Sequence, residues 1–239
     1  MVDFEKQFVR PGCAASEIDG ARARYASVFR QVYGWMCAGL ALSGVVAWYT
    51  ASSGLWEKVL VGPGLMACIF VELALVIALT AAIGKLPYAV ACLMFAGYAA
   101  LNGLTLSVVL VAYDIALVEK AFFVSAGMFG GLALWGTVTK GDLSGIGSFC
   151  GMALWGLVIA LVVNMFLRSS GLDYALSFVG IIVFTGLTMF DAQKVRRLAE
   201  AQGLDDEAVR KAGVIGALAL YLDFINLFLH ILRFMGRKR

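Results

Sequence analysis

The sequence predicts an all-α membrane protein with seven transmembrane helices, and three observations support that prediction. Hydrophobic residues make up 62% of the 239-residue chain. Charged residues make up only 15%, against roughly 25% in a typical soluble domain, and the mean hydropathy is +0.88. Seven stretches have the length and the near absence of charge that indicate a membrane-spanning helix. This composition makes the lipid bilayer the main partner and excludes nucleic-acid binders, Rossmann and P-loop enzymes, and secreted disulfide scaffolds.

The predicted helices are separated by turn-forming or charged segments. Gly62-Pro63-Gly64 and Gly84-Lys85-Leu86-Pro87 contain residues that favour turns, and only the sixth connection, about 193–211, is long and charged. Residues 1–31 are polar and basic and are too long for the charged region of a signal peptide. We therefore expect a cytoplasmic N-terminal segment at 1–31 and one transmembrane domain at 32–239. The predicted spans are 32–51, 65–83, 88–111, 121–139, 145–167, 174–192 and 212–232.

Lysine and arginine residues are distributed unevenly between alternate loops. With the N-terminus inside, the inner segments hold 12 of the 19 basic residues and the outer segments hold 7. Cytoplasmic segments carry an excess of positive charge, so we expect the N-terminus in the cytoplasm. The basic C-terminal tail would prefer the same side, which six spans and one re-entrant segment would allow, and the side of the C-terminus stays open.

Two aspartates lie on the last two predicted helices. Asp223 is in the middle of the seventh span, where a carboxylate needs a partner or a water-filled cavity. Asn226, three residues later, shares its helix face and could hydrogen-bond it; alternatively, a protonated Asp223 simply bonds a neighbouring helix. Asp191 lies one turn after Thr188 and shortly before Lys194. It is either an intramembrane group or a solvated residue at a helix end.

A third carboxylate, Glu72, lies in the second span. At 1.5 Å per residue it is roughly 10 Å below the outer surface. Arg233, at the outer end of the seventh span, has a side chain long enough to reach inward. An ion pair between them would let both charges persist in the membrane; otherwise Glu72 is protonated and Arg233 points to the headgroups.

The sequence offers little material for catalysis, so we expect neither an enzyme nor a bound cofactor. His230 is the only histidine, which excludes a multi-histidine metal site, and the five cysteines include no Cys-x-x-Cys pair. An intramembrane aspartyl protease also needs one aspartate on each of two helices. That chemistry is disfavoured because Asp191 and Asp223 both lack a preceding Gly-x-Gly.

Three segments resemble signature helices of the Bax inhibitor-1 family, the transmembrane Bax-inhibitor-motif proteins. Phe184–Lys194 (FTGLTMFDAQK) is similar to the sixth-helix motif of the family, Gly216–Phe228 (GALALYLDFINLF) to its C-terminal helix, and Asn102–Ser107 (NGLTLS) to its third-helix signature. The likeness in span count and order covers about 30–239. It is the likeness of a bacterial-type member, for which the inner membrane is the expected location.

The resemblance implies a seven-helix fold with the C-terminal helix at the centre, and a pH-sensitive calcium leak through the membrane. It implies that Asp191 and Asp223 form the pH sensor, and that Glu72 and Arg233 form a latch on the far side. Calcium, as the transported ion, would contact Asp191 and Asp223 transiently, with Asn226 and Thr188 along the same path. The alternative is a regulator without transport that binds other membrane proteins, for example a membrane protease or a component of a cell-death pathway.

The spacing of the two aspartates raises a geometric question. On straight helices, Asp223 lies roughly 18 Å from Lys211, whereas Asp191 lies only about 5 Å from Lys194. The carboxyls meet only if the seventh helix begins in the cytosol or the two helices are offset, and residues 204–211 have a helix-forming composition. Two carboxyls in one poorly solvated site do not both ionise cheaply. A shared proton would hold the two helices together, and its loss would separate them.

Overall fold

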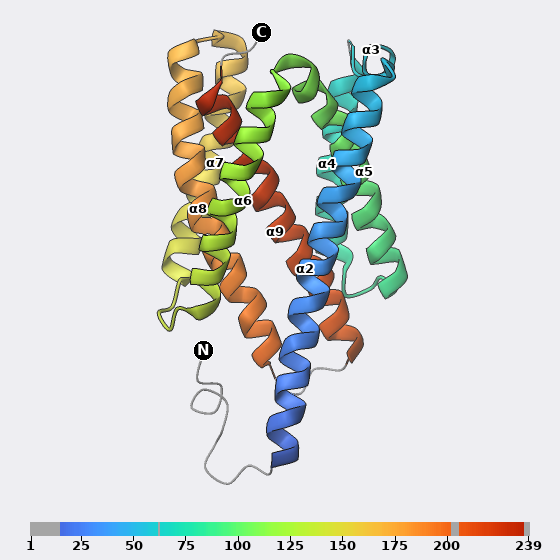
Figure 1. Cartoon of the computed structure of the whole chain (residues 1–239), viewed down its shortest axis with the longest axis vertical. Helices are drawn as coiled ribbons and strands as arrows, with labels where there is room; N and C mark the ends of the chain where they lie inside the picture. The colour runs from blue at the N-terminus through green and yellow to red at the C-terminus, as the bar shows by residue number, and fades with distance from the viewer. Residues whose placement is uncertain (1–14, 62, 202–205, 237–239) are drawn as a thin grey trace.

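The computed structural model describes residues 15–61, 63–201 and 206–236. Within these ranges the chain forms eight helices and no strands (Figure 1). The helices are α2 (Ala15–Ser52), α3 (Leu55–Val59), α4 (Pro63–Ala82), α5 (Tyr88–Ala112), α6 (Ile115–Val138), α7 (Ser144–Leu167), α8 (Ser170–Glu200) and α9 (Asp206–Met235). All of these helices except the short α3 are long and apolar enough to cross a membrane. The prediction of an all-α protein with seven membrane-spanning helices is confirmed.

Several helices extend beyond the apolar stretches that predicted them. Helix α2 begins at Ala15, inside the expected N-terminal segment, and α6 begins at Ile115 rather than at residue 121. Helix α8 continues to Glu200 and α9 begins at Asp206, so most of the charged sixth connection is helical. Hydropathy identifies the part of a helix that lies in lipid, whereas the polar ends of the same helix project beyond it.

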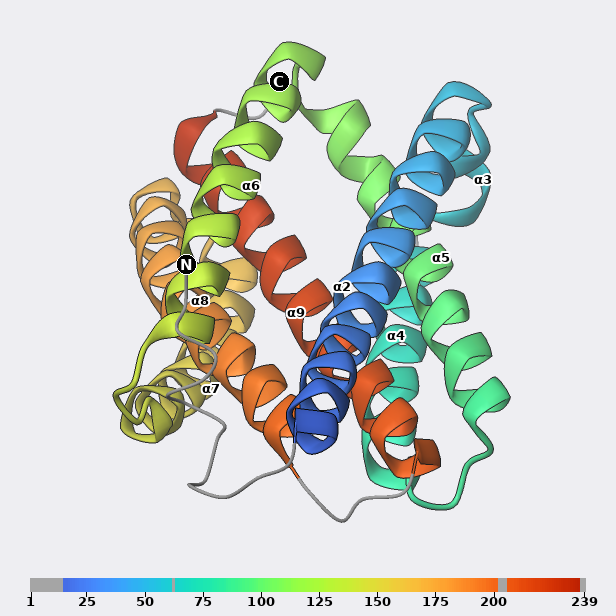
Figure 2. The same cartoon turned by 60° about the horizontal axis from the view of Figure 1, so that its bottom comes forward.

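Helix α9 forms the centre of the bundle. Figures 1 and 2 show it running between a group made of α2, α4 and α5 and a group made of α6, α7 and α8. Of its most apolar 18-residue stretch 61% is buried inside the protein, against 44% or less for the other six helices. Tyr221 and Leu227 of α9 are completely buried. The expectation of a central C-terminal helix is therefore confirmed.

The two ends of the bundle carry different connections. The end with the α4–α5, α6–α7 and α8–α9 connections and the start of α2 is here called the inner end (Figure 1). The opposite end, called the outer end, carries the α5–α6 and α7–α8 connections and the end of α9. Seven crossings put the start of α2 and the end of α9 on opposite sides. This arrangement favours seven spans over six spans with a re-entrant segment.

Two glycines allow neighbouring helices to approach closely. A Cβ atom on Gly103 of α5 would lie 2.6 Å from the backbone oxygen of Ser43 on α2. A Cβ atom on Gly136 of α6 would collide with the backbone of Met189 on α8. Small residues at such contacts let membrane helices pack backbone to backbone. Each group of helices is therefore held together by a close contact of this kind.

Candidate functional site

Asp223 is buried at the centre of the bundle. Its side chain is 4% exposed, and Oδ2 has no hydrogen-bond partner within the described part of the chain. Asp191 of α8 faces Asp223 and interacts with it electrostatically, near enough for one carboxyl to hydrogen-bond the other when a proton is present. We refer to Asp191 and Asp223 as the carboxyl pair. The extension of α8 and α9 beyond their apolar stretches supplies the offset that the sequence required for this meeting.

Lys194 connects the carboxyl pair with the inner end of α8. Its Nζ lies 2.9 Å from Oδ1 of Asp191, three residues earlier on the same helix, and its charge also acts on Asp223. Lys194 is 59% exposed while Asp191 is 14% exposed. Asp191 therefore combines the two roles that the sequence left open, because it faces the interior and also has a partner at the helix end. Sequence reasoning gave Lys194 no role in the pair, although its spacing of three residues was the available signal.

The other two predicted members of the ion path do not complete the carboxyl pair. Thr188 is fully buried, and its hydroxyl donates a 2.7 Å hydrogen bond to the Phe184 carbonyl on its own helix. Asn226 donates from Nδ2 to the Leu222 carbonyl at 2.8 Å and lines a separate cavity. A residue three positions along a helix is rotated by about 60° from the first. On a helix surrounded by protein, such a rotation is enough to place Asn226 against different neighbours from Asp223.

This separate cavity, called the outer cavity, lies between α4, α5 and α9 and has a volume of about 630 Å³. Such a volume is far above the roughly 10–15 Å³ that one water molecule requires. Its lining includes both charged residues of the predicted latch. Its polar lining residues are Glu72, Tyr98, Asn102, Thr105, Tyr113, Asn226 and Arg233. The outer cavity is therefore polar and roomy enough to hydrate a charge inside the membrane.

Glu72 and Arg233 share this cavity without bonding each other. Glu72 accepts a 2.9 Å hydrogen bond from the Thr105 hydroxyl. No ion pair joins Glu72 to Arg233 among the residues with a described placement. Their common cavity makes a pairing accessible by side-chain movement, and the latch itself stays a prediction.

A buried hydrogen-bond network links three helices beside the outer cavity. The Tyr221 hydroxyl of α9 lies 2.6 Å from Ser43 Oγ of α2 and donates to Asn102 Oδ1 of α5 at 3.0 Å. Ser43 Oγ also lies 2.7 Å from the Ala99 carbonyl oxygen. This network ties the central helix to the α2–α5 contact. Sequence reasoning did not assign it, although a tyrosine, a serine and an asparagine inside apolar stretches were the signal.

Comparison with known proteins agrees with the resemblance of the helix motifs. Residues 25–239 match the family described as "Inhibitor of apoptosis-promoting Bax1". The chain belongs to this family, the Bax inhibitor-1 family. It is 46% identical over 221 residues to the inner membrane protein YbhL of Escherichia coli (strain K12), covering 91% of this chain and 94% of that protein. It is 36% identical over 240 residues to the uncharacterized protein RP147 of Rickettsia prowazekii, covering 100% of both.

Membership of the Bax inhibitor-1 family fixes the broad class of the protein. It is a multi-pass membrane protein of a family that is not a known class of enzyme. A relative of similar length is an inner membrane protein, and the seven apolar helices agree with that location.

A polar clamp fastens the inner end of α8 in this family member. Gln193 is 1% exposed; its Oε1 accepts from the Leu143 N–H at 3.0 Å and its Nε2 donates to the Gly141 carbonyl at 2.7 Å. Arg197 donates to Gln193 Oε1 at 2.9 Å and forms an ion pair with Asp142. The α6–α7 connection is thus attached to α8 within two turns of Asp191.

Proposed function

We propose that this protein is a pH-sensitive calcium leak of the membrane, opened and closed by protonation of the carboxyl pair. The observation that carries the proposal is the meeting of Asp223, 4% exposed at the middle of the central helix, with a second carboxyl from α8. Ionisable groups inside a membrane protein mark ion or proton pathways far more often than they serve structure alone. Family membership supports the same proposal.

The gate works through like-charge repulsion between α8 and α9. With one proton shared, the two carboxyls hydrogen-bond each other and hold the helices together. With both ionised, two charges about 4 Å apart repel by about 4 kcal/mol at an effective dielectric constant of about 20. A free energy of this size shifts a two-state equilibrium substantially. Lys194, whose Nζ lies 2.9 Å from Oδ1 of Asp191, is the cation beside the pair, and the repulsion between the two carboxylates drives the helices apart.

The opened site suits a hard divalent cation. Calcium accepts carboxylate, amide and hydroxyl oxygens in irregular geometry. Asp191 and Asp223 supply carboxylates at the pair, while Glu72 and Asn226 supply oxygens in the outer cavity. An ion pair of Glu72 with Arg233 would remove the carboxylate from this path and close the outer end.

The proposal is tested by calcium flux into proteoliposomes over a pH series. Wild-type flux should rise as pH rises, because deprotonation opens the gate. Asp191→Asn and Asp223→Asn should each lose this pH response, because an amide does not ionise. The matched control is Glu119→Gln, which removes an exposed carboxylate of α6 and should keep the wild-type response. An unchanged pH response in both aspartate variants would rule out the carboxyl pair as the sensor.

A second candidate function is supported by the description of the family as an inhibitor of another protein. In this case the bundle binds other membrane proteins and transports nothing. Purified protein without calcium conductance at any pH, together with a specific partner captured by crosslinking in native membranes, would favour this candidate over the leak.

A further inference from the structure

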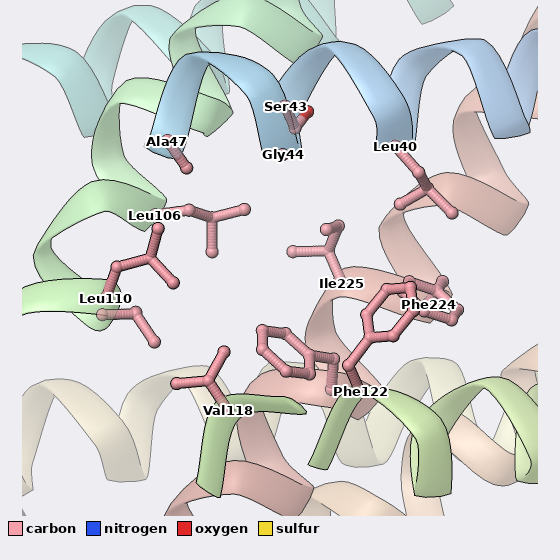
Figure 3. A pocket seen from close by; sticks show the side chains of 12 residues that line it. Leu40, Ser43, Gly44, Ala47, Leu106, Leu110, Val118, Phe122, Phe224 and Ile225 are labelled. Carbon is pink, nitrogen blue, oxygen red and sulfur yellow. The ribbon is translucent and has the colours of Figure 1, made fainter. Parts of the chain in front are cut away.

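A second cavity, called here the apolar groove, lies among α2, α5, α6 and α9 (Figure 3). Its volume is about 160 Å³. In Figure 3, Gly44 of α2, Leu106 of α5, Phe122 of α6, and Phe224 and Ile225 of α9 surround the open space. The groove is distinct from the outer cavity, although Leu106 and Ile225 contribute to both.

The groove offers almost no polar surface to water. Ser43 carries the only polar side chain in its lining; it is 1% exposed, and its hydroxyl lies within hydrogen-bond distance of the Tyr221 hydroxyl and the Ala99 carbonyl. An apolar cavity of about 150 Å³ stays dry and binds small hydrocarbons. The natural occupant of this groove is therefore a hydrocarbon.

The groove opens toward the lipid-facing surface of α2 and α6. Phe122 at its edge is 44% exposed, and Val45 and Trp48, next to the lining residues of α2, are 65% and 66% exposed. Gly44 is exposed, and a Cβ atom there would meet nothing within 4 Å. Because these residues belong to membrane-spanning helices, the medium at the mouth of the groove is lipid hydrocarbon.

We propose that the apolar groove binds the acyl chain of a membrane lipid. A helix from a partner or from a second copy of this chain is about 10 Å in diameter and is too large to enter. A run of methylene groups is narrow enough to enter and matches the lining chemically. The bound chain contacts Phe224 and Ile225, which directly follow Asp223 on α9, and so lies against the helix that carries the buried carboxyl. This inference does not depend on calcium transport.

The test uses the full-length protein reconstituted with a phosphatidylcholine that carries a photoreactive diazirine in one acyl chain. After illumination, mass spectrometry should locate adducts on Phe224 and Phe228, which are only 4% and 7% exposed and line the groove but not the outer cavity. Phe166 on α7, which is 77% exposed, should be labelled as a general lipid contact. An absence of adducts on the two buried residues, with Phe166 labelled, would overturn the proposal.

Two glycine substitutions sharpen this test. Gly44→Phe should fill the groove and abolish the adducts on Phe224 and Phe228, and Gly44→Leu serves the same purpose with a smaller change. Gly34→Phe is the control because Gly34 lies on the same helix, also has nothing within 4 Å of its Cβ position, and does not line the groove. Labelling that persists in folded Gly44 variants would contradict the assignment. Replacing phosphatidylcholine by a phosphatidylglycerol with the same chain should give the same adducts, whereas a headgroup-dependent pattern would contradict an acyl-chain site.

Discussion

At the scale of single residues, the ion pair of Asp142 and Arg197 gives the inner end of the bundle a defined response to pH. Hydrogen bonds from Ser144 and from Arg197 lower the pKa of Asp142 from 3.8 to about 2. A carboxyl with a lowered pKa in the folded state stabilises the fold above its ordinary pKa, and this contribution is lost as the pH falls toward 2. The clamp on α8 is therefore constant at neutral pH and does not contribute to a neutral pH response.

We predict that Ser144→Ala raises the pKa of Asp142 toward 3.8, because the Ser144 hydroxyl makes the largest contribution to the shift. The measurement is the pH titration of the aspartate carboxyl carbons by NMR, with Asp142→Asn identifying the signal. Ser169→Ala, a serine at the other end of the bundle, is the control and should leave the titration unchanged. A wild-type midpoint near 3.8 would contradict the ion pair.

Substitution of Asp142 also tests whether the polar clamp or the carboxyl pair controls the pH response of calcium flux. Asp142→Asn should leave the pH response of calcium flux in place, in contrast to Asp223→Asn. Each substitution removes one carboxyl. A difference in pH response between the two variants therefore comes from the position of that carboxyl in the bundle.

The sequence identified the two aspartates of the candidate site more successfully than it identified the residues that surround them. Asp223 was identified because a carboxyl in an apolar stretch is costly, whereas Asp191 was assigned to the pair by the resemblance to the Bax inhibitor-1 family. Spacing assigned Asn226 to the same site as Asp223, but it did not show which neighbours surround each face of the central helix. The sequence did not indicate the role of Lys194, because a lysine at a helix end is typically solvated.

At the scale of helices, hydropathy gave the position of each span and underestimated several lengths. The charged ends of α8 and α9 are helical because they form their own pairs, such as Arg196 with Glu200 at 3.2 Å and Lys211 with Glu207 at 2.8 Å. Pairs with a spacing of four residues stabilise helices outside the membrane. These extensions bring Asp191 and Asp223 to the same depth.

We predict that Gly136→Ala destabilises the protein by about 1–3 kcal/mol, because the added methyl group collides with the backbone of Met189 and forces α6 away from α8. Thermal unfolding in a fixed detergent measures the effect. Gly131→Ala on the same helix is the matched control, since nothing lies within 4 Å of its Cβ position. Equal stability of the two variants would show that α6 and α8 do not approach this closely.

At the scale of the whole molecule, apolar character alone does not identify the central helix. Helix α4 has the highest mean hydropathy of the seven, 2.5, but only 6% of its apolar stretch is buried, whereas α9 has 1.9 and 61%. Lipid tails are as apolar as a protein core, so both environments accept the same residues. The central position of α9 could therefore be predicted only from family resemblance, while the number of spans followed from the sequence itself.

The orientation of the bundle gives a prediction for labelling in cells. In a variant whose native cysteines are replaced, Lys58→Cys on the exposed α3 should react with a membrane-impermeant maleimide in intact cells. Lys85→Cys, at the inner end, should react only after permeabilisation, because the excess of basic residues predicts a cytoplasmic location for this end. The reverse pattern would invert the orientation, and labelling of both in intact cells would contradict a membrane-spanning α4.

The central position of α9 has a consequence for biosynthesis. Among the spanning helices α9 leaves the ribosome last, yet it is the one against which both groups of helices pack. The six earlier helices are therefore made before the helix against which they pack. Until α9 is present, the Ser43 hydroxyl and the Asn102 amide lack the Tyr221 hydroxyl as a partner. A chain stalled before residue 206 would therefore lack the hydrogen bonds that tie the central helix to the α2–α5 contact.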